Sequence, residues 1–302
     1  MRNDEIDGED FPEYACPYAR RLAAKSRRFA LQVYDPPPGR RGGAADGEGD
    51  YGPDPFGELT TASKVPGLKQ RFPDRVLVMA SDRCFMTCRH CTRRGLFGRT
   101  SVVRTADELA KCVEYVKAHP RVRDVLISGG DPLTLPDDDV MRFVDAFAAL
   151  AQVEVVRVCT RAPCVNPDRV TAALAKRLGE SRKVWVNTQF NCADEVTLEA
   201  AEACANLVRA GIPVSNQTVL LAGVNDSTDA MLALFRALQR ARVRPYYVFQ
   251  CDPVAGVAHF RVPIEKAQEI ARECAERIGG LGLPRFVADV PGSRRKVPLE
   301  EL

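Results

Sequence analysis

The sequence lacks three features that would point to a membrane, to secretion or to nucleic acid. No stretch approaches the roughly 18 uninterrupted apolar residues that span a bilayer. Residues 1–10 are acidic and have no apolar core of the kind found in signal peptides. The formal net charge of +3 is too small to favour nucleic acid or an anionic membrane surface as a partner. These absences predict a soluble, cytoplasmic protein.

The composition is that of a globular protein with many cysteines. The 302 residues are 45% hydrophobic and 27% charged, which is enough to bury the core of one large α/β domain with an extension. The chain has 11 cysteines. Because no export signal is predicted, we expect these to be reduced thiols rather than disulfides.

Short β-rich runs alternate with amphipathic runs of helix length from residue 76 onward, which is typical of βα units around a parallel sheet. We predict strands at 76–81, 124–128, 153–159, 184–189, 214–220 and 244–250, and helices at 105–118, 137–150, 168–178, 197–210, 227–241 and 263–278. Thr197 and Ser227 are predicted helix N-caps, and Gly179 and Gly211 are predicted to follow helix ends. Six such units predict a partial (β/α)6 TIM-like barrel, in which functional residues gather at the C-terminal ends of the strands.

The predicted domain organisation has three parts. Residues 1–60 form an N-terminal extension, with a short helix near 14–25 and a Gly- and Pro-rich stretch that is expected to wrap the barrel or stay mobile. Residues 61–282 form the barrel. Residues 283–302 form a C-terminal segment, which reads as a short strand, a loop and then Lys296. Polar residues end the predicted strands: Ser128-Gly-Gly-Asp131, Cys159-Thr-Arg161, Asn187-Thr-Gln-Phe-Asn191, Asn216-Gln217 and Gln250-Cys-Asp252.

Three cysteines directly after the first predicted strand are the strongest local signal. Cys84, Cys88 and Cys91 have x3 and x2 spacing on one short loop. Thiolates are the usual ligands of iron–sulfur clusters, and a four-iron cluster held at three irons leaves the fourth iron open to a small molecule. A structural zinc site needs four closed ligands, and His90 as the fourth would be strained between its neighbours. The spacing therefore favours a cluster over a zinc site or chance.

The run Cys88-Arg-His-Cys91-Thr-Arg93-Arg94 resembles the lysine 2,3-aminomutase family of radical S-adenosylmethionine (SAM) enzymes. The resemblance covers about residues 54–298 and implies a partial barrel, a [4Fe-4S] cluster on the three cysteines, SAM and pyridoxal 5'-phosphate. It also implies cofactor binding by Gly129, Gly130, Asp131, Gln189 and Gln217, with the glycine backbone receiving the amino group of SAM. A tight turn would explain the two glycines equally well.

The same resemblance assigns the pyridoxal-phosphate site. Lys296 lies seven residues beyond Asp289 in an Asp-x-Pro-Gly segment, as the lysine that binds this cofactor does in the family. Arg71 and Arg75 match the arginines that hold the cofactor phosphate, and guanidinium groups suit phosphate geometry. Alternatives are a solvated tail position for Lys296 and a surface ion pair of the arginines with Asp74.

The substrate site is implied in the same way. Arg93 matches the arginine that binds the substrate carboxylate, and Asp252 and Asp289 match the two acids that face the distal ammonium of lysine. A buried acidic pair predicts a cationic substrate, with lysine first and ornithine or arginine next. The alternative is local: Asp252 caps its loop, and Asp289 pairs with Arg294 or Arg295.

The resulting prediction is a radical SAM, pyridoxal-phosphate-dependent aminomutase that moves the α-amino group of a basic amino acid to the β-carbon. Its predicted partners are a small amino-acid substrate and an electron donor such as flavodoxin or ferredoxin, with homo-oligomer formation left open. Gln189 stands where the family has histidine, and Arg294 and Arg295 stand where it has glycines. The alternatives are action on a lysine of elongation factor P, a radical SAM enzyme with a different outcome, and a non-catalytic zinc-binding scaffold.

Overall fold

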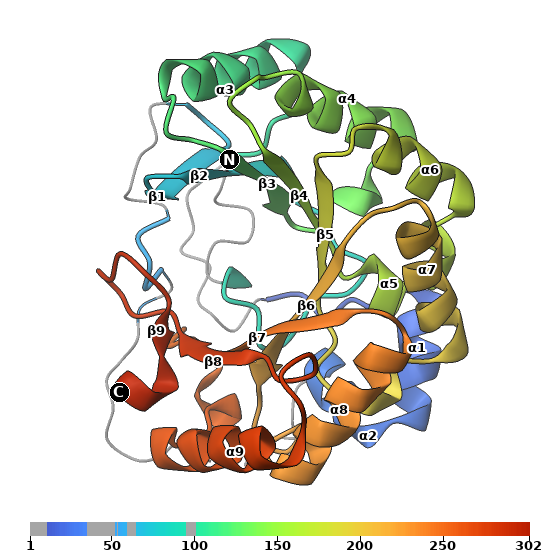
Figure 1. The fold of residues 1–302 in the computed structure, drawn as a ribbon, viewed down its shortest axis with the longest axis vertical. Helices are drawn as coiled ribbons and strands as arrows, with labels where there is room; N and C mark the ends of the chain where they lie inside the picture. Colours follow the sequence, from blue (N-terminus) through green and yellow to red (C-terminus); the bar gives the residue numbers. More distant parts are fainter. Residues whose placement is uncertain (1–10, 35–51, 53, 59–64, 95–100) are drawn as a thin grey trace.

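The computed structural model describes residues 11–34, 52, 54–58, 65–94 and 101–302. Within these residues, nine strands form one curved sheet in sequence order (Figure 1). They are β1 Leu68–Phe72, β2 Arg75–Ser81, β3 Asp124–Gly129, β4 Val155–Cys159, β5 Val184–Thr188, β6 Val214–Leu220, β7 Arg244–Gln250, β8 Arg285–Ala288 and β9 Val297–Pro298. Strands β2 to β8 are parallel, whereas β1 and β9 are antiparallel edge strands.

Helices follow the parallel strands and cover the outer face of the sheet (Figure 1). They are α3 Ala106–Ala118, α4 Asp137–Ala148, α5 Ala162–Val165, α6 Ala172–Glu180, α7 Leu198–Arg209, α8 Thr228–Arg240 and α9 Ile264–Arg277, with 3₁₀ turns at Pro132–Thr134, Pro167–Arg169, Ala193–Glu195, Ala258–Phe260 and Leu299–Glu301. The six units from β2 to α9 confirm the predicted partial (β/α)6 barrel. β8 pairs with β7 in parallel, so the C-terminal segment continues the barrel sheet.

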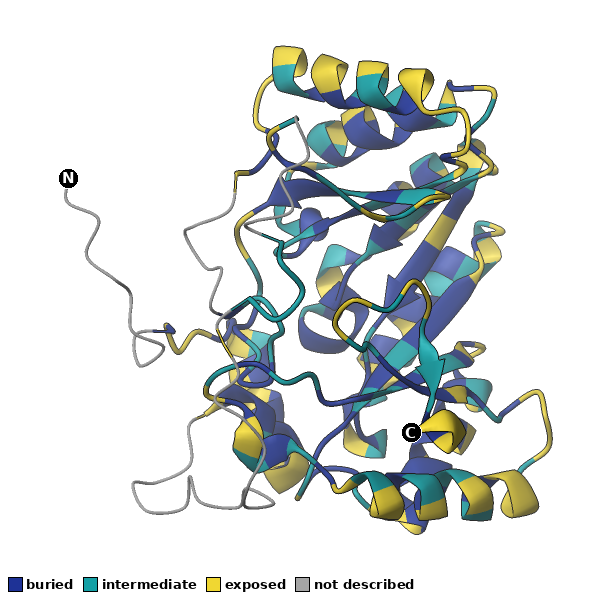
Figure 2. Cartoon of the chain, turned by 90° about the vertical axis from the view of Figure 1, so that its left-hand side faces the viewer, coloured by how far each residue is buried: buried dark blue, intermediate teal, exposed yellow. Residues whose placement is uncertain are grey.

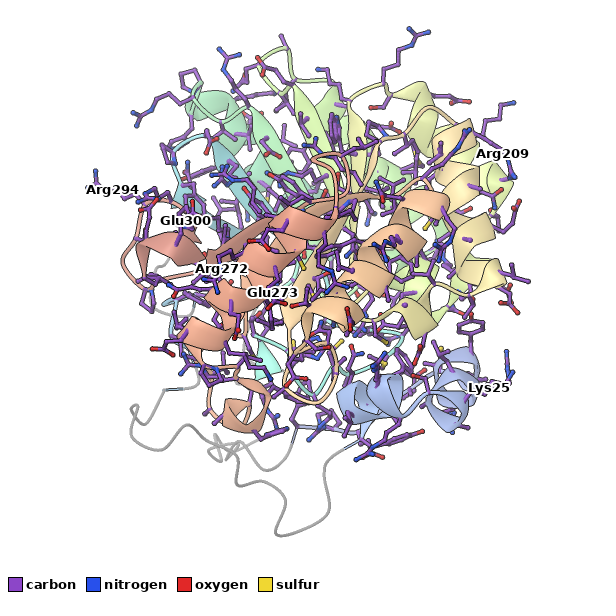
Figure 3. The ribbon with its side chains drawn as sticks, turned by 60° about the horizontal axis from the view of Figure 1, so that its bottom comes forward. Lys25, Arg209, Arg272, Glu273, Arg294 and Glu300 are labelled. Atoms are coloured by element: carbon purple, nitrogen blue, oxygen red, sulfur yellow. The ribbon has the colours of Figure 1, made fainter. Side chains whose placement is uncertain are left out.

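Burial explains why these segments form a barrel. Val78, Ile127 and Val158 stand in register on neighbouring strands, share one face of the sheet and are fully buried in one apolar core with side chains of the helices. The helices are buried toward the sheet and exposed outward (Figure 2). Charged side chains such as Arg209 and Arg272 lie on the outer helical surface (Figure 3). No helix in the described ranges has the length and hydrophobicity needed to cross a bilayer.

Most helix boundaries follow from capping residues. Thr197 accepts from the backbone N–H of Ala200, and Ser227 caps α8 in the same way, as predicted. Gly211 follows α7 at φ +77°, also as predicted. The prediction for Gly179 is wrong, because this residue lies inside α6, where a Cβ atom would come within 2.3 Å of the Ala210 carbonyl oxygen. The glycine therefore serves close packing and not helix termination.

Two other segments differ from prediction. The predicted helix 168–178 is a 3₁₀ turn followed by α6, because Thr171 caps the later start through the N–H of Leu174. The predicted helix 14–25 begins only at residue 17. Two helices form here, α1 Pro17–Lys25 and α2 Arg27–Val33, and Ser26 between them caps α2. Residues 35–51 of the predicted extension lie outside the described residues.

Gly129 and Gly130, at the end of β3, contact the backbone of Ser81 and Arg83, which lead into the cysteine loop. The N–H of Gly130 donates to the Ser81 carbonyl oxygen at 2.6 Å. A Cβ atom on Gly129, which has φ +111°, would lie 2.3 Å from the same oxygen, and one on Gly130 would lie 2.3 Å from the Arg83 carbonyl oxygen. Close backbone contact, rather than a tight turn alone, therefore requires both glycines.

This contact gives a stability prediction. Gly130→Ala is expected to lower the free energy of unfolding by about 3 kcal/mol, because overpacking against a fixed backbone costs on the order of 1–3 kcal/mol or more. Chemical denaturation measures the change. Gly279→Ala is the matched control, since nothing lies within 4 Å of its added Cβ. Equal stability of the two variants would contradict the steric explanation.

Candidate active site

The predicted site residues come from the C-terminal ends of the parallel strands. The cysteine loop follows β2, Gln189 follows β5, Asp252 follows β7 and Asp289 follows β8. Because β2 to β8 are parallel, these ends lie on the same edge of the curved sheet. Gln217 differs, since it lies within β6 rather than beyond its end.

The cysteine loop is held by the N-terminal segment. Ala15 and Met86 form an antiparallel bridge, in which the N–H of Cys16 donates to the Phe85 carbonyl oxygen at 2.8 Å. Farther along the loop, the N–H of Arg89 donates to the carbonyl oxygen of Gln32 in α2 at 2.9 Å. The extension thus fixes the loop backbone on both sides of Cys88.

Cys84, Cys88 and Cys91 are half-buried free thiols. Burial, and then the charge of neighbouring thiols, raises the pKa of Cys84 and raises that of Cys91 to about 11. Among the described residues, no three His, Cys, Asp or Glu side chains are gathered as a single metal ion requires. A cluster binds each thiolate through a different iron, whereas a structural zinc ion needs four ligands on one metal.

His90 is a buried neutral imidazole beside the cysteines. Burial, and then the charge of Arg161, lowers its pKa well below the usual value. The Gln189 side-chain nitrogen lies 3.1 Å from His90 Nε2, and that of Asn191 lies 3.3 Å away. These amide nitrogens contact Nε2, whereas His90 Nδ1 is buried and has no hydrogen-bond partner among the described residues.

Lys296 lies against the barrel and is not extended into solvent. Its ammonium pairs with Asp289, and the Lys296 and Asp289 side chains are 24% and 11% exposed. The Lys296 Nζ atom is 4.8 Å from the ring centroid of Phe249 on β7 and 5.8 Å from that of Phe72 on β1. The solvated-tail alternative is therefore wrong.

The predicted phosphate arginines share this region but have different partners. Arg71 Nη1 lies 3.1 Å from Asp289 Oδ1, and Arg71 Nη2 donates to the Val290 carbonyl oxygen at 3.2 Å. Arg75 forms the alternative ion pair with Asp74, also at 3.1 Å. Both guanidinium groups lie over the Phe72 ring, at 5.4 and 4.0 Å from its centroid. Phe72 thus gathers both arginines and the lysine ammonium around one aromatic ring.

The local alternative for Asp289 is also wrong. Its carboxylate contacts Arg71 and Lys296, whereas Arg295 pairs with Glu301. Arg294 is exposed and points away from the barrel (Figure 3). The two arginines that replace family glycines therefore leave the Asp289–Lys296 contact intact.

Asp252 is a half-buried acid whose Oδ1 atom is buried and can still accept a hydrogen bond. Within the described part of the chain, its Oδ1 atom has no hydrogen-bond partner. Burial, and then the charge of Asp289, raises the pKa of Asp252 to about 7, while Lys296 opposes the increase. This environment favours a cationic ligand, which would allow the carboxylate to ionise.

Arg93 and Asp131 already have protein partners. Arg93 Nε donates to Glu58 at 2.8 Å, and Arg93 Nη2 donates to the same carboxylate at 3.0 Å. The Asp131 carboxylate accepts from the Thr160 hydroxyl at 2.7 Å and from the Arg161 N–H at 2.8 Å. Asp131 thus joins the ends of β3 and β4, and its direct contact with a cofactor stays a prediction.

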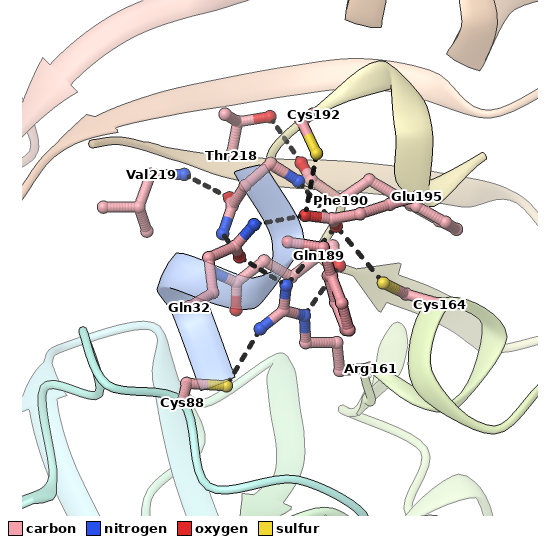
Figure 4. Close-up of polar contacts among 12 residues, drawn as sticks. Gln32, Cys88, Arg161, Cys164, Gln189, Phe190, Cys192, Glu195, Thr218 and Val219 are labelled. Atoms are coloured by element: carbon pink, nitrogen blue, oxygen red, sulfur yellow. Dashed lines mark hydrogen bonds and ion pairs between the residues drawn. The ribbon is translucent and has the colours of Figure 1, made fainter. Parts of the chain in front are cut away.

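Sequence reasoning missed a buried polar network next to Cys88 (Figure 4). Arg161 donates to the Cys88 sulfur at 3.0 Å and also contacts Gln32 and Glu195. The polar strand end Cys159-Thr-Arg161 was a signal for this network. Gln32 carried no signal, because α2 was not predicted.

Comparison with known proteins identifies the family. The radical SAM superfamily model matches residues 78–235, slightly more than half of the chain. A protein named "Putative L-lysine 2,3-aminomutase" from Treponema pallidum is 37% identical over 249 residues, which cover 82% of this chain and 70% of that protein. The chain belongs to the lysine 2,3-aminomutase family. Membership of this radical SAM family supports an iron–sulfur cluster and SAM as cofactors.

Two further relatives match over a similar share of this chain. "L-lysine 2,3-aminomutase" from Fusobacterium nucleatum is 44% identical over 237 residues, and the match covers 78% of this chain and 56% of that protein. The chain thus spans little more than half the length of this relative. "Glutamate 2,3-aminomutase" from Clostridioides difficile is 34% identical over 246 residues, which cover 82% of this chain and 58% of that protein.

Solved structures support the barrel independently of close sequence similarity. Streptococcus suis SuiB bound to S-adenosylmethionine has a TM-score of 0.53 and 15% identity, with coverage of 72% of this chain and 51% of that chain. At this identity, the likeness shows the fold alone. The predicted mixed α/β architecture with a partial TIM-like barrel is confirmed.

Proposed function

We propose that the chain is a radical SAM, pyridoxal-phosphate-dependent aminomutase that moves the α-amino group of a basic amino acid to the β-carbon. Lysine is the first candidate, followed by ornithine and arginine. The observation that carries the proposal is the contact of Lys296 with Asp289 beside half-buried Asp252, at the strand ends that also bear the cysteine loop. A nucleophilic amine and an acidic pocket are thus assembled on a radical SAM barrel.

The cofactors and this chain would divide the work. When bound, the reduced cluster would supply the electron that cleaves SAM, and pyridoxal phosphate would supply the aldehyde that carries the migrating amino group. Cys84, Cys88 and Cys91 would hold a [4Fe-4S] cluster at three irons, with electrons from a flavodoxin- or ferredoxin-like donor. Gly129, Gly130, Gln189 and Gln217 would orient SAM.

The group around Phe72 fits pyridoxal phosphate chemically. Lys296 would bind the cofactor aldehyde through its side-chain amine, which lies half-buried between the Phe72 and Phe249 rings. Arg71 and Arg75, which both contact the Phe72 ring, would hold the phosphate. Arg71 would exchange its present contact with Asp289 for that anion.

Charge complementarity supports a basic substrate. Asp252 Oδ1 is buried and has no partner among the described residues, and Asp289 is released when Lys296 changes partner. These two carboxylates would bind the distal ammonium. Arg93 would bind the substrate carboxylate near the cysteine loop, sharing its donors with Glu58 or exchanging one carboxylate for the other.

The raised pKa of Asp252 predicts a pH dependence of substrate binding. Below about pH 7 this carboxyl is protonated and neutral, so it attracts an ammonium weakly, and above that pH it is anionic. The KM for lysine is therefore expected to fall between about pH 6 and pH 8. Asp252→Asn should flatten this profile and raise the KM about tenfold at pH 8, which corresponds to loss of about 1.4 kcal/mol.

A stability measurement separates this effect from unfolding. The pKa of Asp252 in the folded protein is raised above the usual value near 4. The protonated carboxyl therefore contributes to the free energy of unfolding at low pH, and this contribution is lost as the pH rises from about 4 to about 7. Asp252→Asn should therefore unfold no more readily than the parent protein at pH 8. Asp229→Asn, at a surface ion pair with Arg277, is the control and should keep the parent KM profile. A pH-independent parent KM would contradict the assigned role.

The proposed activity is tested with anaerobically reconstituted protein, SAM, pyridoxal phosphate and a chemical reductant. The expected result is the β-amino isomer of lysine, with less or none from ornithine and arginine. Iron, sulfide and pyridoxal phosphate are quantified on the same sample. A fully loaded protein that isomerises none of the three amino acids, or that acts only on a protein lysine, would overturn the proposal.

A further inference from the structure

We propose that Arg161 is a positioning residue for the iron–sulfur cluster, whose hydrogen bond to Cys88 raises the cluster's reduction potential. Arg161 follows β4, and Arg161 Nη1 donates to the Cys88 sulfur at 3.0 Å (Figure 4). The inference rests on the proposed function, because Cys88 must be a cluster ligand. It adds a residue that lies outside the cysteine motif.

Arg161 is aimed at the sulfur by a buried network. Its Nη2 atom donates to Gln32 Oε1 at 2.7 Å and lies 3.3 Å from Glu195 Oε2. The Glu195 side chain is completely buried, and Gln32 donates to its other oxygen at 2.6 Å. Since Nη2 satisfies these partners, Nη1 is left directed to Cys88. The ion pair with Glu195 alone does not explain why Arg161 Nη1 also donates to the Cys88 sulfur.

The network extends to the N-terminal helix α2. Gln32 Oε1 also accepts from Asn191 Nδ2 at 2.9 Å, and the Gln32 carbonyl oxygen accepts from the N–H of Arg89 in the cysteine loop. One residue of α2 therefore contacts the loop backbone and also fixes the guanidinium that reaches the loop sulfur. The radical SAM model match begins only at residue 78, so α2 adds a contribution from outside the matched region.

The expected effect on the cluster follows from its charge. Reduction adds an electron, and part of that negative charge resides on the cysteine sulfurs. A cationic N–H donor stabilises the more negative state, so it raises the reduction potential. Arg161 is buried and its contact with Cys88 is partly buried, so the effect is screened less than that of a surface contact would be. Removing this donor should make the cluster harder to reduce.

The test compares Arg161→Met with Arg157→Met in reconstituted protein. Arg157 lies on β4, the strand that precedes Arg161, and pairs with Asp124, so its replacement also removes a partly buried arginine ion pair. Redox titration followed by electron paramagnetic resonance (EPR) should show that R161M is about tenfold less reduced at a given potential, a downward shift of about 59 mV for one electron. R157M should keep the parent potential, and Arg161→Lys should recover part of the shift.

A measurement on the parent protein keeps the inference testable if R161M does not fold. With arginine labelled with ¹⁵N only at its guanidinium nitrogens, pulsed electron–nuclear double resonance on the reduced cluster should detect a ¹⁵N coupling. This labelling leaves out the Arg93 backbone nitrogen, which lies 3.4 Å from Cys91 Sγ. That coupling should disappear in R161K protein labelled in the same way. A parent potential retained in R161M, or the absence of a ¹⁵N coupling in the parent, would overturn the role of Arg161.

Iron and sulfide analysis separates this inference from the proposed function. A parent protein that holds no cluster after reconstitution overturns both. A loaded, active parent whose potential is the same in R161M overturns the role of Arg161 alone.

Discussion

Replacing any one of Cys84, Cys88 and Cys91 with serine is expected to remove most of the bound iron and to lower activity at least about a thousandfold. Serine offers a hard oxygen in place of a soft thiolate, and the three positions supply all the protein ligands of the proposed cluster. Iron and sulfide content, the EPR spectrum of the reduced protein and SAM cleavage measure the loss. Circular dichroism checks that the fold persists.

Cys112→Ser is the matched control for these variants. Cys112 is completely buried in α3 and belongs to the apolar core. Its replacement changes the same atom in the same residue type, so it is expected to lower stability and leave iron content unchanged. A serine variant at position 84, 88 or 91 with the full iron content and turnover of the parent would disprove the ligand assignment.

Lys296→Ala is expected to lower aminomutase activity at least about a thousandfold while leaving the cluster intact. The side chain supplies the proposed covalent attachment for pyridoxal phosphate, and alanine cannot replace the amine. Borohydride reduction of the parent followed by peptide mass analysis should find a pyridoxyl group on Lys296. The variant should show no such group, yet should contain the parent amount of iron.

The control for Lys296 is Lys266→Ala. Lys266 on α9 forms an ion pair with Asp226 at the surface, so its loss should change neither cofactor content nor turnover. Cluster-loaded K296A that retains activity would remove the lysine from the reaction. A pyridoxyl group found only on another lysine would also contradict the assignment.

The barrel could be predicted from the sequence because its signals are local. Six strands and most of their helices follow from alternating apolar runs, and Thr197 and Ser227 mark helix starts through their own hydroxyl groups. The cysteine motif is also local, since one loop carries all three thiols. Edge strand β1 was missed because two of the five residues of Leu68–Phe72 are charged and the strand is stabilised by pairing with β2.

The contacts that complete the candidate site could not be predicted in the same way. Arg161, Gln32 and Glu195 are separated by up to 163 residues, and each would read as an ordinary polar residue alone. The prediction for Gly179 is wrong because a glycine near a predicted helix end can also lie inside the helix, where another backbone segment approaches it closely. Tertiary proximity, which the local pattern does not encode, decided both cases.

The bridge between residues 14–16 and the cysteine loop has a consequence for biosynthesis. The ribosome makes this N-terminal strand first, but its partner at Thr87 emerges 73 residues later, and Gln32 meets Glu195 only after a further delay. Such distant pairings form late during folding, because the intervening chain must first be ordered. Delivery of iron and sulfide to the nascent chain before Glu195 has emerged would therefore precede the formation of their complete binding site.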